Sequence, residues 1–111
     1  MVDEINKVKE KYGKIDILVN NAGVSDSTPI DKYTAERFAS VMDLNVNAMM
    51  NGILPTVAIM KEQGGGCILN TSSMVSICGQ PGGVAYPSSK YAVNGLTWSL
   101  ARELGPFHIR V

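Results

Sequence analysis

A tyrosine, a lysine and a serine in the second half of the chain have the types and spacing needed for proton transfer. Tyr86 and Lys90 are four residues apart, and Ser73 precedes the tyrosine by thirteen positions. Residues at i and i+4 can share one face of a helix, so we expect the Lys90 ammonium near the Tyr86 phenol. That charge favours the phenolate, and such a tyrosine can exchange a proton with an alcohol or carbonyl oxygen near neutral pH. Ser73 could hold that oxygen by a hydrogen bond.

Two polar features come earlier in the chain. Asn45 lies in an otherwise apolar stretch, where an amide needs partners, and a bridging water could be one of them. The turn at 20–23, Asn-Asn-Ala-Gly, directly follows a short apolar run. Each feature alone has a structural interpretation, since Tyr-x-x-x-Lys occurs by chance in helices, Ser73 could be a turn residue, and Asn45 could be a satisfied buried amide. Their conjunction, in this order, favours a functional site.

The elements that must position these residues alternate between helices and strands. Apolar spacing and turn residues predict the order αβαβαβ, which is typical of a parallel α/β layer structure with right-handed crossovers. Apolar residues on nearly every face of the long second helix predict burial on more than one side. We expect helices at 3–12, 34–63 and 86–104, strands at 15–19, 67–71 and 108–111, and loops at 25–31 and 74–85. Within these we expect a C-cap at Gly13, an N-cap at Thr34, a kink at Pro55, and a strand position without catalytic duty for His108.

Composition limits the class of protein. The 111 residues suffice for one small domain, and the net charge is zero with scattered Lys and Arg, so we expect neither a nucleic-acid nor a membrane partner. No apolar run reaches the roughly 20 residues of a membrane-spanning helix. We expect a cytoplasmic protein in which Cys67 and Cys78 are reduced thiols, and we predict no metal site.

At this point the chain resembles the short-chain dehydrogenase/reductase family over nearly its whole length. The matching features are DILVNNAG at 16–23, Asn45, Ser73, Tyr86 and Lys90, with Asn45 and Ser73 separated by 28 positions. The segments GGGCILNTSS and LARELGPFHIRV are also similar to the fifth strand and to the end of the sixth helix of the family.

The resemblance implies a fold and a reaction. Residues 1–111 would form a single, incomplete, Rossmann-like three-layer domain that holds strands 4, 5 and the start of 6 of the order 3-2-1-4-5-6, without the N-terminal βαβ half. The implied reaction is reversible hydride transfer between NAD or NADP and a secondary alcohol or ketone.

The resemblance also implies a role for each matching residue. Tyr86 would be the general acid/base, and Lys90 would bind the nicotinamide ribose and favour the phenolate. Ser73 would orient the substrate oxygen, and Asn45 would bind a water in the proton relay. The segment Asn21, Ala22 and Gly23 would line the ribose of the cofactor.

The sequence departs from the family pattern in the parts that would bind the cofactor phosphates, select NAD or NADP, and cover the substrate. It contains no TGxxxGxG loop for the pyrophosphate, because the glycines at 64–66 follow a helix and precede a strand. Two interpretations stay open: a truncated oxidoreductase that we expect to be inactive alone, or a non-catalytic remnant unable to bind the dinucleotide. In both we expect a homo-oligomer, assembled through the long helices and the exposed edge of the strand at 15–20. An apolar or medium-sized substrate is indicated by residues that would shape the pocket: Met74, Val75, Ile77, Pro81 and Val84.

Overall fold

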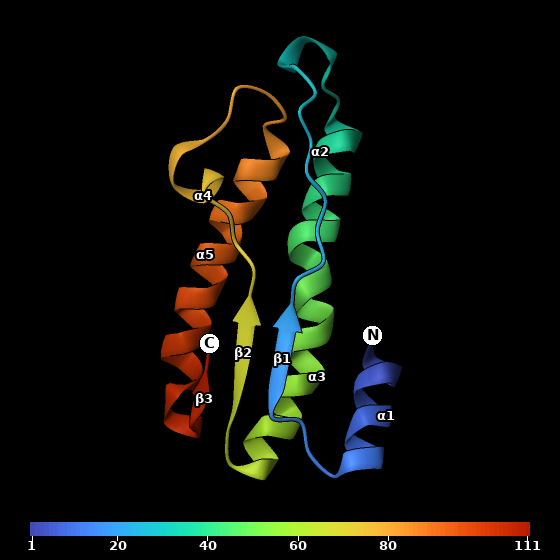
Figure 1. Ribbon diagram of the computed structural model, residues 1–111, viewed down its shortest axis with the longest axis vertical. Coiled ribbons are helices and arrows are strands. Elements are labelled where there is room, and N and C mark those ends of the chain that lie inside the picture. The colour runs from blue at the N-terminus through green and yellow to red at the C-terminus, as the bar shows by residue number, and fades with distance from the viewer.

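Three adjacent parallel strands form the only sheet of the molecule. The computed structural model describes all residues from 1 to 111 and contains β1 (Ile17–Asn20), β2 (Gly66–Asn70) and β3 (Ile109–Arg110) in the order β1-β2-β3. Leu18 pairs with Ile68, and Gly66 pairs with Ile109. Strands β1 and β2 point toward the same end of the molecule, where the segments leading to α2 and α4 begin (Figure 1). The predicted parallel α/β arrangement, a partial Rossmann-like fold, is confirmed.

Helices connect and cover these strands in the predicted alternation. They are α1 (Val2–Tyr12), α2 (Ala35–Met42), α3 (Ala48–Gln63), α4 (Val75–Cys78) and α5 (Ala85–Leu104), with 3-10 turns η1 (Ile30–Lys32) and η3 (Gly105–Phe107) and a π-helical turn η2 (Asp43–Asn47). The predicted caps are present: Gly13 ends α1 in the left-handed conformation, and the Thr34 side chain accepts a hydrogen bond from the Arg37 amide at the start of α2.

Two local predictions from the sequence were wrong, and a third missed a local feature. The helix predicted over 34–63 is confirmed as continuous helical backbone from Ala35 to Gln63 that runs across Pro55, but it contains the π-helical turn η2 between α2 and α3. The loop predicted over 74–85 contains the short helix α4. His108 precedes β3 and has φ 62°, because it ends η3 in the left-handed region. Apolar periodicity cannot detect these features, since each is shorter than two helical turns or concerns one residue.

The core lies between one face of the sheet and the helices. Leu18 and Ile68 pack into it, whereas their neighbours Val19 and Leu69 are exposed on the opposite face. The molecule measures 50 × 27 × 17 Å, so its thickness accommodates one sheet and one layer of helices. Nine buried apolar side chains make up the core: Ile5, Ile15, Met49, Ile53, Met60, Ile68, Val93, Leu104 and Ile109.

The long second helical segment is buried on one side only, contrary to the expectation from its composition. Buried positions of α3 recur at helical spacing and face the sheet. Leu44 and Leu54 remain exposed on the other side, and Phe38 is exposed in the first turns of α2. No helix of the molecule has both the length and the apolarity that crossing a membrane requires.

Candidate functional site

Residues from three separate segments meet beyond the carboxyl ends of β1 and β2. Gly23, in the turn after β1, lies so close to η2 and α5 that a Cβ atom there would sit 3.1 Å from Asn45 Oδ1 and 3.6 Å from Lys90 Nζ. Open parallel sheets bind ligands at this end of their strands. The structure therefore brings together the predicted Gly23, Asn45 and Lys90.

Asn45 is completely buried, and protein groups surround its amide. Its Oδ1 accepts from the Val24 amide at 2.8 Å, and its Nδ2 donates to the Val24 carbonyl at 2.9 Å and to Ser89 Oγ at 3.0 Å. Ser89 Oγ in turn donates to the Tyr86 carbonyl at 2.7 Å. Asn45 thus ties the turn after β1 to the first turn of α5, on a π-helical segment of the kind often found at functional sites.

Lys90 and Tyr86 lie side by side on the first turns of α5. The lysine is 4% exposed, and its Nζ lies 5.8 Å from the centroid of the Tyr86 ring. The Nζ donates one hydrogen bond, to the Thr71 carbonyl at 3.1 Å. An ammonium group has three donors, so two of them have no protein acceptor. A nearly buried cation with free donors suits a ligand that offers several hydroxyl oxygens.

Ser73 lies at the same end of the sheet, three residues after β2, but is not hydrogen-bonded to Tyr86 or Lys90. Its Oγ accepts from the Val75 amide at 3.3 Å, and its carbonyl accepts from the Ser76 amide and hydroxyl. Its neighbour Ser72 donates to Asn94 Oδ1 on α5 at 2.7 Å. The end of β2 is thereby attached to α5 next to Lys90.

A chain of amide and hydroxyl bonds also joins the strand ends to α5. Asn20 Nδ2 donates to Asn70 Oδ1 at 2.9 Å, and Asn70 Nδ2 donates to Thr97 Oγ1 at 3.0 Å. Thr71 Oγ1 donates to Asn21 Oδ1 at 2.8 Å. The exposed turn of Asn21, Ala22 and Gly23 is thus fixed at its start by β2 and at its end by Asn45.

A hydrogen-bonded cluster that the sequence reasoning missed surrounds Asp26. Its side chain is 3% exposed and accepts from Arg37 Nε and Nη2, from the Tyr33 hydroxyl at 2.5 Å, and from the amide and hydroxyl of Thr28. The bonds from Arg37, followed by that from Tyr33, hold the pKa of Asp26 well below its ordinary range. Burial and the Asp26 bond raise the pKa of Tyr33. The local signal was the Asp-x-Thr sequence, which favours an Asx-turn.

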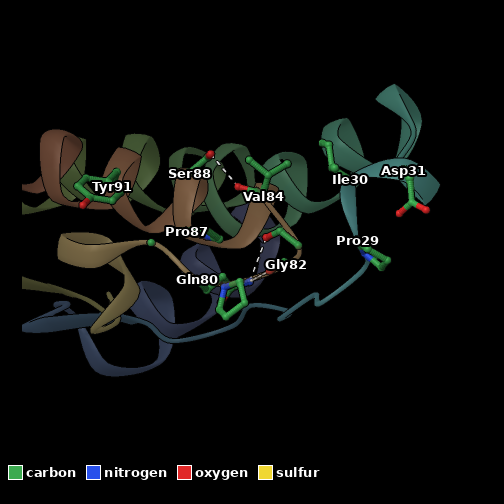
Figure 2. Close-up of a pocket in the computed structure, with 12 residues that line it drawn as sticks. Pro29, Ile30, Asp31, Gln80, Gly82, Val84, Pro87, Ser88 and Tyr91 are labelled. Carbon is green, nitrogen blue, oxygen red and sulfur yellow. Dashed lines mark hydrogen bonds between the residues drawn. The ribbon is translucent and has the colours of Figure 1, made fainter.

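A recess of about 600 Å³ lies beside this cluster, between residues 29–31, residues 79–84 and the start of α5 (Figure 2). Pro87, Ser88 and Tyr91 line it from α5, and Tyr86 does not. At 3.6 residues per turn, Ser88 and Tyr91 point away from the helix face that carries Tyr86 and Lys90. Of the apolar residues predicted to shape a pocket, Pro81 and Val84 line the recess, whereas Met74 and Ile77 are strongly exposed. No three His, Cys, Asp or Glu side chains are grouped as a metal site would require.

Known proteins are similar to this chain in sequence. The chain is 64% identical over 107 residues to a 3α-hydroxysteroid dehydrogenase of Mediterraneibacter gnavus, covering 96% of this chain and 43% of the relative. It is 39% identical to a 3-oxoacyl-[acyl-carrier-protein] reductase of Thermotoga maritima, covering 96% of this chain and 44% of that protein. The chain therefore spans less than half the length of these relatives.

Solved structures also match this chain over less than half of their own length. The crystal structure of an NAD⁺-bound xylitol dehydrogenase superposes with a TM-score of 0.93 at 36% identity, covering 99% of this chain and 43% of that one. The sequence profile of the family described as short chain dehydrogenase matches residues 1–111. With the whole length matched and the predicted Rossmann-like fold present, this chain belongs to the short-chain dehydrogenase family.

Proposed function

We propose that these residues carry the proton-transfer centre of an oxidoreductase that interconverts a secondary alcohol and a ketone with NAD or NADP. The observation that carries the proposal is the convergence of Gly23, Asn45, Tyr86 and Lys90 beyond the strand ends. The buried ammonium of Lys90 beside the phenol of Tyr86 supplies the positive charge that a phenolate base needs.

The residues present fit the ribose of a nicotinamide cofactor. Two N–H donors of Lys90 have no protein acceptor, and a ribose offers two vicinal hydroxyl groups to such donors. The exposed turn of Asn21, Ala22 and Gly23 lies against the same ammonium. The nicotinamide, when bound, supplies or accepts the hydride.

The proton then moves through residues of this chain. Tyr86 gives a proton to the developing alkoxide in reduction and takes it back in oxidation, and Lys90 stabilises the phenolate state. Ser73 donates its hydroxyl hydrogen to the substrate oxygen, a role that requires it to turn from its present acceptor bond with Val75. Asn45 lies next to the Gly23 turn. We assign it the role of binding the water molecule that returns a proton to Lys90.

We propose a 3α-hydroxysteroid and its 3-ketone as the first substrate pair to test. The support is the 64% identity to the hydroxysteroid dehydrogenase, against 39% to the 3-oxoacyl reductase. The two free thiols fit a reducing cytoplasm as the place of the reaction.

The test measures NADH and NADPH oxidation with a 3-ketosteroid and with a 3-oxoacyl thioester. It uses the natural gene product that carries these 111 residues. We expect turnover with the steroid and a loss of kcat of about 10²- to 10⁴-fold in Tyr86→Phe. Tyr91→Phe is the matched control, because Tyr91 lies on the same helix and faces away from Lys90. Equal activity of wild type and Tyr86→Phe would refute the assigned role, and a preference for the thioester would refute the substrate.

A second candidate function, a non-catalytic homo-oligomeric remnant, is favoured by the apolar surface of this chain. Leu54 is 63% exposed and Trp98 is 68% exposed, on the two long helices, and β1 has a free sheet edge. Light scattering of the 111-residue chain and of Trp98→Glu tests assembly, and an NAD(P)H titration separates the candidates. Micromolar cofactor binding supports the oxidoreductase, whereas an oligomer without binding at millimolar cofactor supports the remnant.

A further inference from the structure

The Asp26 carboxylate organises the segment that follows the Gly23 turn. It receives hydrogen bonds from its own segment at Thr28, from Tyr33 beyond η1, and from Arg37 in the first turn of α2. A nearly buried carboxylate with this many donors is held in one orientation, because losing any of them leaves a desolvated charge poorly compensated. The backbone of residues 26–28 is therefore fixed relative to α2.

This fixed backbone contacts residues 82–83 directly. The Gly83 amide donates to the Thr28 carbonyl at 2.8 Å. A Cβ atom on Gly82 would lie 2.8 Å from the Ser27 carbonyl oxygen, and one on Gly83 would overlap the Asp26 carbonyl. The two segments thus approach as closely as backbone allows, and only glycine fits at this contact.

Gln80 adds a side-chain bridge at the same place. Its Nε2 donates to the Asp26 carbonyl at 2.8 Å and also lies within hydrogen-bond distance of the Gly82 and Gly83 carbonyls (Figure 2 shows Gln80 and Gly82 joined). The contact between the segment of Asp26 and the segment of Gly83 is therefore made by backbone and side chain together.

The contact continues to Tyr86. The Tyr86 amide donates to the Gly83 carbonyl at 3.2 Å, which starts the first turn of α5. A chain of hydrogen bonds thus leads from the Asp26 carboxylate through Thr28 and Gly83 to the backbone of Tyr86.

We propose that Asp26 is a positioning residue for Tyr86. Together with Tyr33, Gln80 and Gly83, Asp26 forms a clamp. This clamp sets the position of the first turn of α5, and hence of the Tyr86 phenol, relative to Asn45 and Lys90. This inference rests on the proposed function in that Tyr86 transfers the proton. Asp26 touches none of Asn45, Tyr86 or Lys90 and is not itself a catalytic residue. Small misplacements of a reacting group are costly, about 10²-fold in rate for 1 Å.

The test compares Asp26→Asn with Asp31→Asn in the natural gene product. Asp31 lies on the same segment and has no hydrogen bond or ion pair, which makes it the matched control. We expect Asp26→Asn to lower kcat per folded molecule by about tenfold or more, with the cofactor KM unchanged. Amide hydrogen exchange at Gly83 and Tyr86 should accelerate in the same variant, and Asp31→Asn should match wild type in both measurements.

If Asp26→Asn does not fold, Tyr33→Phe removes one donor and should change kcat and exchange in the same direction. Unchanged kcat per folded molecule, or unchanged exchange at Gly83 and Tyr86, would overturn the clamp, because a merely structural role lowers only the folded fraction. A wild-type protein without turnover would refute the proposed function, and amide exchange in Asp26→Asn would still decide whether the carboxylate holds the Tyr86 backbone.

Discussion

Replacing Asn45 by alanine should reveal how strongly the turn after β1 is held to α5. The change removes three hydrogen bonds, two with the Val24 backbone and one with Ser89 Oγ. At about 1 kcal/mol net each, their loss destabilises the protein by about 3 kcal/mol. Val24 is exposed enough for water to reach its freed groups, which limits the cost, whereas the cavity left at a fully buried position adds to it. We expect about 2–4 kcal/mol in total.

Urea unfolding of the natural gene product measures this loss. With m-values of about 1–3 kcal/mol/M, a loss of about 3 kcal/mol lowers the midpoint by about 1–3 M. Asn47→Ala is the control, because Asn47 lies on the same π-helical turn but is exposed and bonds only to Asp43. It should change the stability by less than about 0.5 kcal/mol. Equal effects of the two substitutions, or a loss below about 1 kcal/mol for Asn45→Ala, would refute the assigned hydrogen-bond role.

Two further predictions concern the clamp. Because Arg37 and Tyr33 lower the folded-state pKa of Asp26, its stabilisation is complete above the ordinary aspartate value of about 3.9 and is lost as the pH falls below it. Urea titrations from pH 6 to about 2 should therefore show a shallower acid limb in Asp26→Asn than in wild type, and identical limbs would contradict this account. Gly83→Ala and Gly79→Ala both place alanine at positive φ, at a cost of about 1–3 kcal/mol, but only Gly83→Ala meets a backbone carbonyl, and it should cost about 1–3 kcal/mol more. Equal midpoints for the two alanine variants would show that the segments are not in contact in solution.

The sequence by itself determined the order of elements and the family. Helix and strand periodicity depend on neighbours within a few residues, so α1, the helical stretch from α2 to α3, α5 and the three strands were predictable to within a few positions. The four-residue spacing of Tyr86 and Lys90 likewise implied their proximity, which the structure gives as 5.8 Å from Nζ to the ring centroid.

Only the tertiary structure decided which distant groups meet. Asn45 bonds to Val24 and Ser89, which are 21 and 44 positions away, and nothing in the local pattern distinguishes these partners from other polar residues. Asp26 was missed for the same reason, since its importance comes from Arg37 and from the backbone contact with Gly83, which exists because two loops converge at one end of the sheet. Local spacing fixes the face on which a side chain lies, whereas hydrogen-bond partners across segments follow from how the elements pack.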